Sequence, residues 1–204
     1  MKEVCTLPKQ ARALRTYDAV LDAAAYEFAR YGYANTNLQK IADQIGLTKG
    51  ALYGHFSNKE ELAAVLSAHL TAVVELPLGE AKASTDPAFD RLRALMLTLG
   101  EIFQGDVRAR AALRLTLETA QASGVTAALL EETHAVVLRL VGEVQQEGRW
   151  DASASAKAVA DLLVAAFFGV FWMGSAAERT ESGGRVAAMW NVLAHALRSK
   201  ATGQ

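Results

Sequence analysis

The sequence predicts a globular protein with an all-α fold, and three observations support this prediction. Only three prolines, Pro8, Pro77 and Pro87, occur in 204 residues, so most of the chain is free to form helices. Alanine and leucine are abundant and β-branched residues are not clustered, which favours helices over strands. Hydrophobic residues make up 51% of the chain and charged residues 21%, a composition typical of a globular protein.

The first predicted helix spans residues 11–31 and ends at Gly32, because glycine commonly terminates a helix. Its apolar face consists of residues at helical spacing, namely Leu14, Tyr17, Val20, Leu21, Ala24, Tyr26 and Phe28.

Two short helices are predicted next, over 38–45 and 49–56, with a turn at Gly46 between them. Asn37 and Thr48 precede these helices and carry the side-chain oxygens that cap helix N-termini.

Ser57 and Glu60 match a capping box, which predicts a longer helix from Asn58 to Pro77. A loop over 77–86 then leads to Asp86-Pro87, a typical helix start. The remaining predicted helices cover 87–103, 106–121, 125–148, 153–178 and 184–199.

Residues 32–60 form a compact segment, GYANTNLQKIADQIGLTKGALYGHFSNKE. Two short helices with inward apolar faces and a glycine turn make a helix-turn-helix, whose second helix has a small, polar start that fits a major groove. Gly50 and Ala51 allow close approach of the backbone, and Lys49 can donate to a guanine edge. Helix pairs of this kind also occur in proteins that never touch DNA, so periodicity alone leaves both interpretations open.

The run GLTKGALY followed by HF and KE, after an Ile-Ala helix and Gly-Tyr, resembles the TetR family of repressors. The resemblance implies a helix-turn-helix DNA-binding domain over 1–58, with three helices. It also implies a larger helical domain over 59–204 for ligand binding and dimerisation.

The resemblance also implies roles for individual residues. Thr48, Lys49 and Gly50 face DNA, with Lys49 in direct base readout, and four residues lie near phosphates: Asn37, Tyr53, His55 and Lys59. Simpler roles stay open for three of them: Tyr53 in the core, His55 against the first helix, and Lys59 in solvent. Gly54 departs from the family, which more often has a large residue there.

Three short stretches in the larger domain resemble the γ-butyrolactone autoregulator receptors, a TetR subgroup: LRAL at 92–95, LRLT at 113–116 and RVAAMW at 185–190. The segment 131–134 lacks the pocket tryptophan that the subgroup often places there. A regulator with an unrelated ligand, or with none, therefore stays open.

The effector pocket is predicted from one apolar set, Leu95, Met96, Leu99, Phe168 and Trp172. The last two long helices are expected to pair across a twofold axis, joined by Val186 and Trp190.

Charge and cysteine content set limits on function and compartment. The net charge is −1, but residues 1–60 carry eight basic and six acidic residues, which suits a DNA-binding head on an acidic body. Cys5 is the only cysteine and no secretory signal is evident, so we expect a cytoplasmic protein that is not bound to a membrane. Zinc-ligand spacing and cofactor-binding motifs are absent from the sequence, so we expect no metal, no cofactor and no enzyme activity.

The sequence therefore predicts a ligand-responsive transcriptional repressor. We expect a homodimer that binds an inverted-repeat operator in double-stranded DNA and is released by a small, largely apolar effector, with a γ-butyrolactone as one candidate. An all-α enzyme without a recognisable motif and a nucleoid-type architectural protein are the alternatives from other classes.

Overall fold

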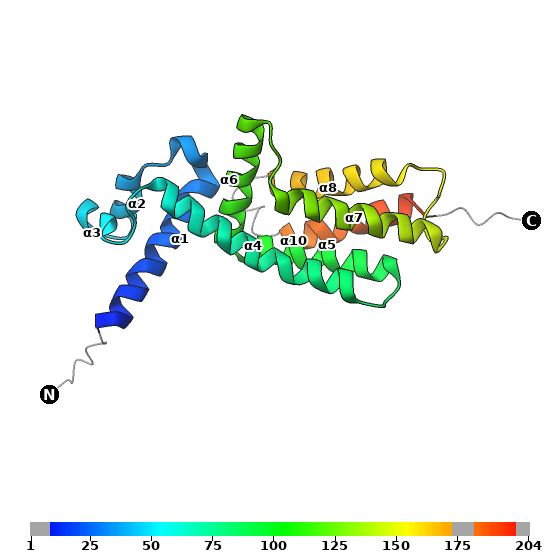
Figure 1. Ribbon diagram of the computed structural model, residues 1–204, viewed down its shortest axis with the longest axis horizontal. Coiled ribbons are helices and arrows are strands. Elements are labelled where there is room, and N and C mark those ends of the chain that lie inside the picture. Colours follow the sequence, from blue (N-terminus) through cyan, green and yellow to red (C-terminus); the bar gives the residue numbers. More distant parts are fainter. Residues whose placement is uncertain (1–8, 173–181, 199–204) are drawn as a thin grey trace, which may run out of the picture. The chain divides into compact units, whose positions relative to one another are not determined.

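The computed structural model describes residues 9–172 and 182–198, and helices dominate it (Figure 1). In the described ranges the extended pairing is limited to an isolated bridge between Trp150 and Arg198, and the all-α prediction is confirmed. The helices, in chain order, are α1 (Lys9–Asn35), α2 (Leu38–Gln44), α3 (Lys49–Tyr53), α4 (Lys59–Ala83), α5 (Ala88–Gly105), α6 (Val107–Ser123), α7 (Ala128–Gln146), α8 (Ala156–Trp172) and α10 (Ser182–Ala196). The predicted end of the helix at 153–178 lies outside the described residues.

The chain divides into two compact units that differ from the predicted domains. The first unit contains the chain up to Leu70 together with Val107–Ser123, and the second contains Thr71–Asp106 and the chain from Gly124 onward. Helix α4 contributes to both units. Helix α6 belongs to the first unit, although the predicted boundary between the two domains lies after residue 58.

In the first unit, α1 packs against α6 and buries Val20, Leu21, Ala24 and Phe28. Leu14 and Tyr26 were also expected on this apolar face, but Leu14 is 60% exposed and Tyr26 44%. The predicted face was too wide, because the contacts of α1 with α6 and α2 bury only a narrow stripe of this helix.

Helix α1 is interrupted at Gly32, where φ is +77° and ψ is 176°. The break frees backbone groups on both sides, and two side chains of α6 bind them. Glu118 Oε2 accepts from the N–H of Tyr33 at 2.9 Å, and Arg114 donates to the carbonyl of Ala29 at 3.0 Å. Arg114 Nε also donates to Glu118 at 2.7 Å, so the two α6 residues act as one remote cap.

The capping box at the start of α4 lies one residue later than predicted. Asn58 Oδ1 accepts from the N–H of Glu61 at 2.8 Å, and the Glu61 carboxylate accepts from the N–H of Ser57 at 2.7 Å. Glu60, the predicted partner in the box, accepts instead from the hydroxyl of Tyr33.

Helix α4 continues through Pro77 to Ala83, so the predicted loop over 77–86 is shorter than expected. A fully buried or nearly buried residue recurs every four positions along it, at Leu62, Leu66, Leu70, Val74 and Leu78. By length and composition alone α4 is apolar enough to cross a membrane, but this buried stripe is what a core helix of a globular protein requires.

The second unit contains two aromatic clusters. Phe103 of α5 contacts Phe167 and Phe171 of α8, with ring centroids 6.0 and 5.6 Å apart. Phe89 contacts both Trp150 and Trp190. Trp190 is only 2% exposed and Val186 is fully buried against Gly100. The expectation that these two residues join an intersubunit face is therefore wrong, because both are used inside the protomer.

Candidate nucleic-acid interface

Helices α2 and α3 form the predicted helix-turn-helix (Figure 1, cyan). The turn depends on Gly46, whose φ of +67° favours glycine, and the N–H of Leu47 bonds back to the carbonyl of Ala42 at 2.9 Å. Both predicted caps form. Asn37 Oδ1 accepts from the N–H of Gln39 at 2.8 Å, and Thr48 Oγ1 accepts from the N–H of Ala51 at 3.2 Å.

Helix α3 has one buried side and one open side. Leu52 is fully buried, and Phe56 lies beneath the helix with its ring stacked on Tyr17, 4.8 Å between centroids. Thr48, Lys49 and Gly50 are exposed, and a side chain added at Gly50 would meet nothing within 4 Å. The sequence places small and polar residues on the side of α3 that is free to approach another molecule.

Helix α3 is shorter than predicted. It ends at Tyr53, and Gly54 is its C-cap, so the helix does not reach Phe56. The backbone N–H groups of His55 and Phe56 both bond to the carbonyl of Leu52. Tyr53 is 43% exposed, which excludes a core position, while His55 is half-buried.

The two lysines of the predicted interface differ in how they are held. The exposed Lys49 ammonium lies 5.7 Å from the centroid of the Tyr53 ring. Lys59 Nζ donates to the carbonyl of Tyr33 at 2.7 Å and to that of Thr36 at 3.3 Å, and it lies 4.2 Å from the Tyr33 ring centroid. Lys59 therefore binds one carbonyl in the last turn of α1 and one just after this helix, and it is not a solvated side chain.

Tyr33 is itself held by Glu60. Its hydroxyl donates to Glu60 Oε1 at 2.7 Å. Burial, and secondly this hydrogen bond, raise the pKa of Tyr33 to about 12. The same bond lowers the pKa of the Glu60 carboxyl from its usual value.

Two cations that the sequence analysis did not select lie beside the helix-turn-helix. Arg30 of α1 and Lys40 of α2 both stack on the ring of Tyr31, 5.3 and 5.7 Å from its centroid. All three side chains are exposed. Arg30, Tyr31 and Lys40 match no sequence motif, so their proximity is seen only in the structure.

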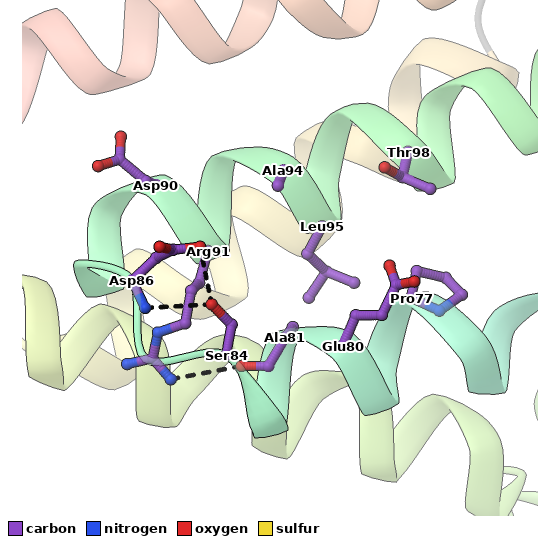
Figure 2. Close-up of a pocket in the computed structure, with 10 residues that line it drawn as sticks. All are labelled: Pro77, Glu80, Ala81, Ser84, Asp86, Asp90, Arg91, Ala94, Leu95 and Thr98. Atoms are coloured by element: carbon purple, nitrogen blue, oxygen red, sulfur yellow. Dashed lines mark hydrogen bonds between the residues drawn. The ribbon is translucent and has the colours of Figure 1, made fainter.

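The second unit contains a cavity of about 370 Å³ between α4 and α5 (Figure 2). Its lining includes Leu95, one of the predicted effector-pocket residues. Around Leu95, Figure 2 shows Pro77, Glu80 and Ala81 of α4 facing Ala94 and Thr98 of α5. The cavity is therefore partly apolar, with acidic groups at its edge.

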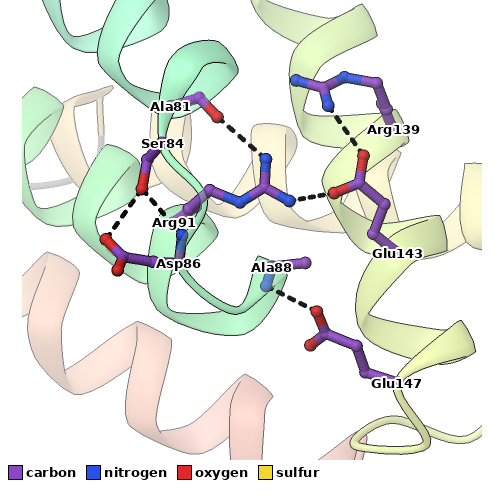
Figure 3. A network of polar contacts seen from close by, with 8 residues as sticks. All are labelled: Ala81, Ser84, Asp86, Ala88, Arg91, Arg139, Glu143 and Glu147. Carbon is purple, nitrogen blue, oxygen red and sulfur yellow. Dashed lines mark hydrogen bonds and ion pairs between the residues drawn. The ribbon is translucent and has the colours of Figure 1, made fainter.

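A polar network anchors the loop end of this cavity (Figure 3). Arg91 of α5 donates to the carbonyl of Ala81 and forms an ion pair with Glu143 of α7. Glu143 also accepts from Arg139 at 2.8 Å, and Glu147 accepts from the N–H of Ala88 at 2.8 Å.

The network also changes the expected start of α5. Asp86 was predicted to cap this helix, but its side chain accepts from the hydroxyl of Ser84. The cap comes from Glu147, which lies 59 residues after Ala88 in the sequence.

The other predicted pocket residues lie deeper in the second unit. Met96 and Leu99 are buried on α5, and Phe168 is half-buried beside Phe167, with centroids 6.0 Å apart. The side chain of Trp172 lies outside the described residues. Leu95, Met96 and Leu99 thus lie on α5 and Phe168 lies on α8. The role of the five predicted residues in ligand binding stays a prediction.

The helix-turn-helix region is similar in sequence to a known protein family. Residues 20–66 match the family described as "Bacterial regulatory proteins, tetR family". The chain is 42% identical over 69 residues to the A-factor receptor protein of Streptomyces griseus, an alignment that covers 34% of this chain and 25% of that protein. The chain thus matches about a quarter of the length of this curated relative.

Solved structures extend the similarity over nearly the whole chain. One is a gamma-butyrolactone receptor described as ArpA-like, with a TM-score of 0.71, 25% identity, and coverage of 92% of this chain and 90% of that one. Another is the TetR family protein CprB from Streptomyces coelicolor in complex with its operator, with a TM-score of 0.72, 25% identity, and coverage of 94% and 92%.

Proposed function

The chain belongs to the TetR family of bacterial regulatory proteins, and we propose on this basis that it is a homodimeric transcriptional repressor. It binds an inverted-repeat operator in double-stranded DNA and leaves it when a small, largely apolar effector binds. TetR family proteins are transcription regulators and not enzymes, so the enzyme alternative is set aside. We place its action in the cytoplasm, where its operator lies.

The observation that carries this proposal is the open face of α3. Thr48 caps the helix and Leu52 anchors it, which leaves Lys49 and Gly50 exposed at its first turn. This is the part of a recognition helix that meets base edges. The similarity to CprB, solved with its operator, supports the same assignment.

The dimer is proposed on the outer faces of α8 and α10, which pack against each other in the second unit. Leu162 of α8 is 48% exposed and Val192 of α10 is 68% exposed. Exposed alanines flank them at Ala158, Ala165 and Ala188. Small residues around a few large ones permit close helix packing, and a twofold interface uses the same face of both copies.

The effector is proposed to bind in the second unit near Leu95, Met96 and Leu99 of α5. These residues are buried, and Leu95 lines the cavity of Figure 2. Similarity to gamma-butyrolactone receptors makes a γ-butyrolactone with an apolar substituent the first compound to test. The acidic groups at the cavity edge and the segment 131–134 favour a second candidate, an effector of different chemistry.

Fluorescence anisotropy tests the DNA-binding part. Labelled DNA from upstream of the chain's own gene is titrated with protein, with scrambled DNA as competitor and at several salt concentrations. We expect competitor-resistant binding of two subunits per site. Lys49→Ala should reduce the preference for the operator over scrambled DNA by about tenfold or more, since a good base contact contributes ~1–3 kcal/mol of discrimination. Arg93→Ala, an exposed arginine of α5, serves as the charge-matched control.

An unchanged preference in Lys49→Ala would show that this residue does not read bases. If no upstream fragment bound the protein more tightly than scrambled DNA does, an operator upstream of the protein's own gene would be excluded. For the effector, the intact lactone is compared with its ring-opened hydroxy acid. Release by the lactone alone supports a butyrolactone signal, and release by neither supports the candidate of different chemistry.

A further inference from the structure

A second cavity, of about 310 Å³, lies at one end of the second unit. Three chain segments meet there: the first turn of α5, the connection between α7 and α8, and the last turn of α10 (Figure 1). The second and third of these segments are joined by the bridge between Trp150 and Arg198, and by a hydrogen bond from the N–H of Asp151 to the carbonyl of Leu197 at 2.9 Å. The lining residues are Phe89, Gly148, Arg149, Trp150, Ala194 and Arg198.

The polar side chains of this lining are all hydrogen-bond donors. Trp150 is only 2% exposed, and its indole Nε1 is buried without an acceptor in the described part of the chain. A buried N–H without an acceptor costs ~1–3 kcal/mol, and because this one is closed to solvent, the donors that a ligand can reach are those of the two arginines. Arg149 and Arg198 add two guanidinium groups, and neither guanidinium donates a hydrogen bond to an acceptor of the lining residues.

The guanidinium groups are also not neutralised by the nearest carboxylates in the sequence. Glu147 accepts from the N–H of Ala88, and Asp151 accepts from the N–H of Ser153, both at 2.8 Å. No ion pair joins Arg149 or Arg198 to a carboxylate within 9–172 and 182–198. Both arginines are exposed, so the cavity is open to a ligand from solution.

Aromatic rings form the rest of the lining. Phe89 and Trp150 meet edge to face, with centroids 6.0 Å apart, and the Arg149 guanidinium lies 4.5 Å from the centroid of the Phe89 ring. This contact fixes the plane of the guanidinium, which then presents its donors in a fixed fork.

We propose that this cavity binds a small carboxylate carried on a planar apolar body, such as an aromatic acid. The carboxylate accepts from the guanidinium groups of Arg149 and Arg198, which suit paired acceptors. The apolar body packs against the half-buried ring of Phe89. This site is separate from the cavity of Figure 2 and from the proposed effector residues on α5.

Isothermal titration calorimetry on the full chain tests the proposal with benzoate as the probe. Benzamide, which has the same ring without the charge, is the ligand control. We expect saturable benzoate binding that is about tenfold or more tighter than benzamide binding. Arg149→Gln and Arg198→Gln should each weaken benzoate binding about tenfold, whereas Arg93→Gln, the same change on the exposed face of α5, should leave it within about twofold.

The proposal is overturned if benzoate and benzamide bind alike, if benzoate does not saturate, or if Arg93→Gln weakens binding as much as Arg198→Gln does.

Discussion

Glu118 of α6 accepts the backbone N–H of Tyr33 in α1, with 2.9 Å between Oε2 and N. This N–H has no helical acceptor because α1 breaks at Gly32. Arg114, four residues before Glu118, binds the carbonyl of Ala29 on the other side of the break. A single turn of α6 thus satisfies both a donor and an acceptor that the kink exposes.

Glu118→Ala should lower the free energy of unfolding by about 1–3 kcal/mol, because the half-buried N–H of Tyr33 loses its acceptor. Glu118→Gln should lose less, since the amide oxygen still accepts. Chemical denaturation measures both changes. Glu101→Ala, an exposed glutamate of α5, should alter stability by less than about 0.5 kcal/mol. Equal effects of Glu118→Ala and Glu101→Ala would contradict the capping role.

Gly32→Ala should destabilise the protein by at least about 2 kcal/mol, because the φ and ψ values at this residue are essentially restricted to glycine. The added Cβ would also collide with the Glu118 carboxylate. Gly142→Ala is the control, since a Cβ there meets nothing within 4 Å inside α7, and it should stabilise by up to ~1 kcal/mol. Thermal unfolding of both variants gives the comparison, and a stable Gly32→Ala protein would exclude a strained backbone at this position.

Lys59→Ala and Lys49→Ala should separate stability from DNA binding. Lys59 binds the carbonyls of Tyr33 and Thr36, so its removal should lower unfolding free energy by about 1–2 kcal/mol as well as DNA affinity. Lys49 is exposed, so Lys49→Ala should leave the melting temperature unchanged. If Lys59→Ala affected DNA affinity alone, the hydrogen bonds of Lys59 to Tyr33 and Thr36 would contribute nothing to folding.

Tyr33→Phe should change the pKa of Glu60 and the dependence of stability on alkaline pH. The pKa of Glu60 should rise toward its ordinary value, because the hydroxyl that lowers it is gone. In the unaltered protein the pKa of Tyr33 is raised from 10.0 to about 12, so the folded state holds a proton that the unfolded chain releases. The stability that Tyr33 contributes is fully present below pH 10 and is lost as the pH rises toward about 12.

NMR titration of the Glu60 carboxyl and denaturation at alkaline pH check both effects of Tyr33→Phe. The pKa of Asp161, lowered first by Lys157 and then by His134, should stay unchanged as an internal control. A Glu60 titration curve that does not move would rule out the hydroxyl of Tyr33 as the cause of the lowered pKa.

Glu147→Ala and Asp86→Ala distinguish the observed cap of α5 from the cap that local sequence predicts. Glu147 accepts the N–H of Ala88, so its loss should cost about 1 kcal/mol. Asp86 bonds to Ser84 within the exposed loop, and its replacement should cost less. Urea denaturation of the two variants provides the test, and the reverse order of stability would restore Asp86 as the cap.

The sequence was sufficient for the helices and for the caps of the helix-turn-helix, because periodicity and side-chain caps are local signals. Asn37 and Thr48 act as predicted. The cap of α5 was missed because its acceptor, Glu147, is distant in the sequence. The extension of α4 past Pro77 was missed because proline usually ends a helix, yet here burial of the stripe from Leu62 to Leu78 outweighs its local cost.

The candidate interface was predictable in its residue types but not in its contacts. The predicted phosphate ligand Lys59 also binds the carbonyls of Tyr33 and Thr36, and the cations Arg30 and Lys40 both contact the ring of Tyr31. Such contacts depend on the packing of α1, which no local motif encodes. The roles of the seven predicted DNA-facing residues and of the five predicted pocket residues remain predictions.

The inclusion of α6 in the first unit has a consequence for biosynthesis. Chains fold as they leave the ribosome from the N-terminus, with early segments waiting for their partners. Because Arg114 and Glu118 complete the cap at Gly32, the N-terminal module cannot reach its final structure until residue 123 has been translated. A fragment that stops at the end of the helix-turn-helix would therefore emerge with an open kink in α1, and the nascent module would stay vulnerable to proteolysis until α6 arrives.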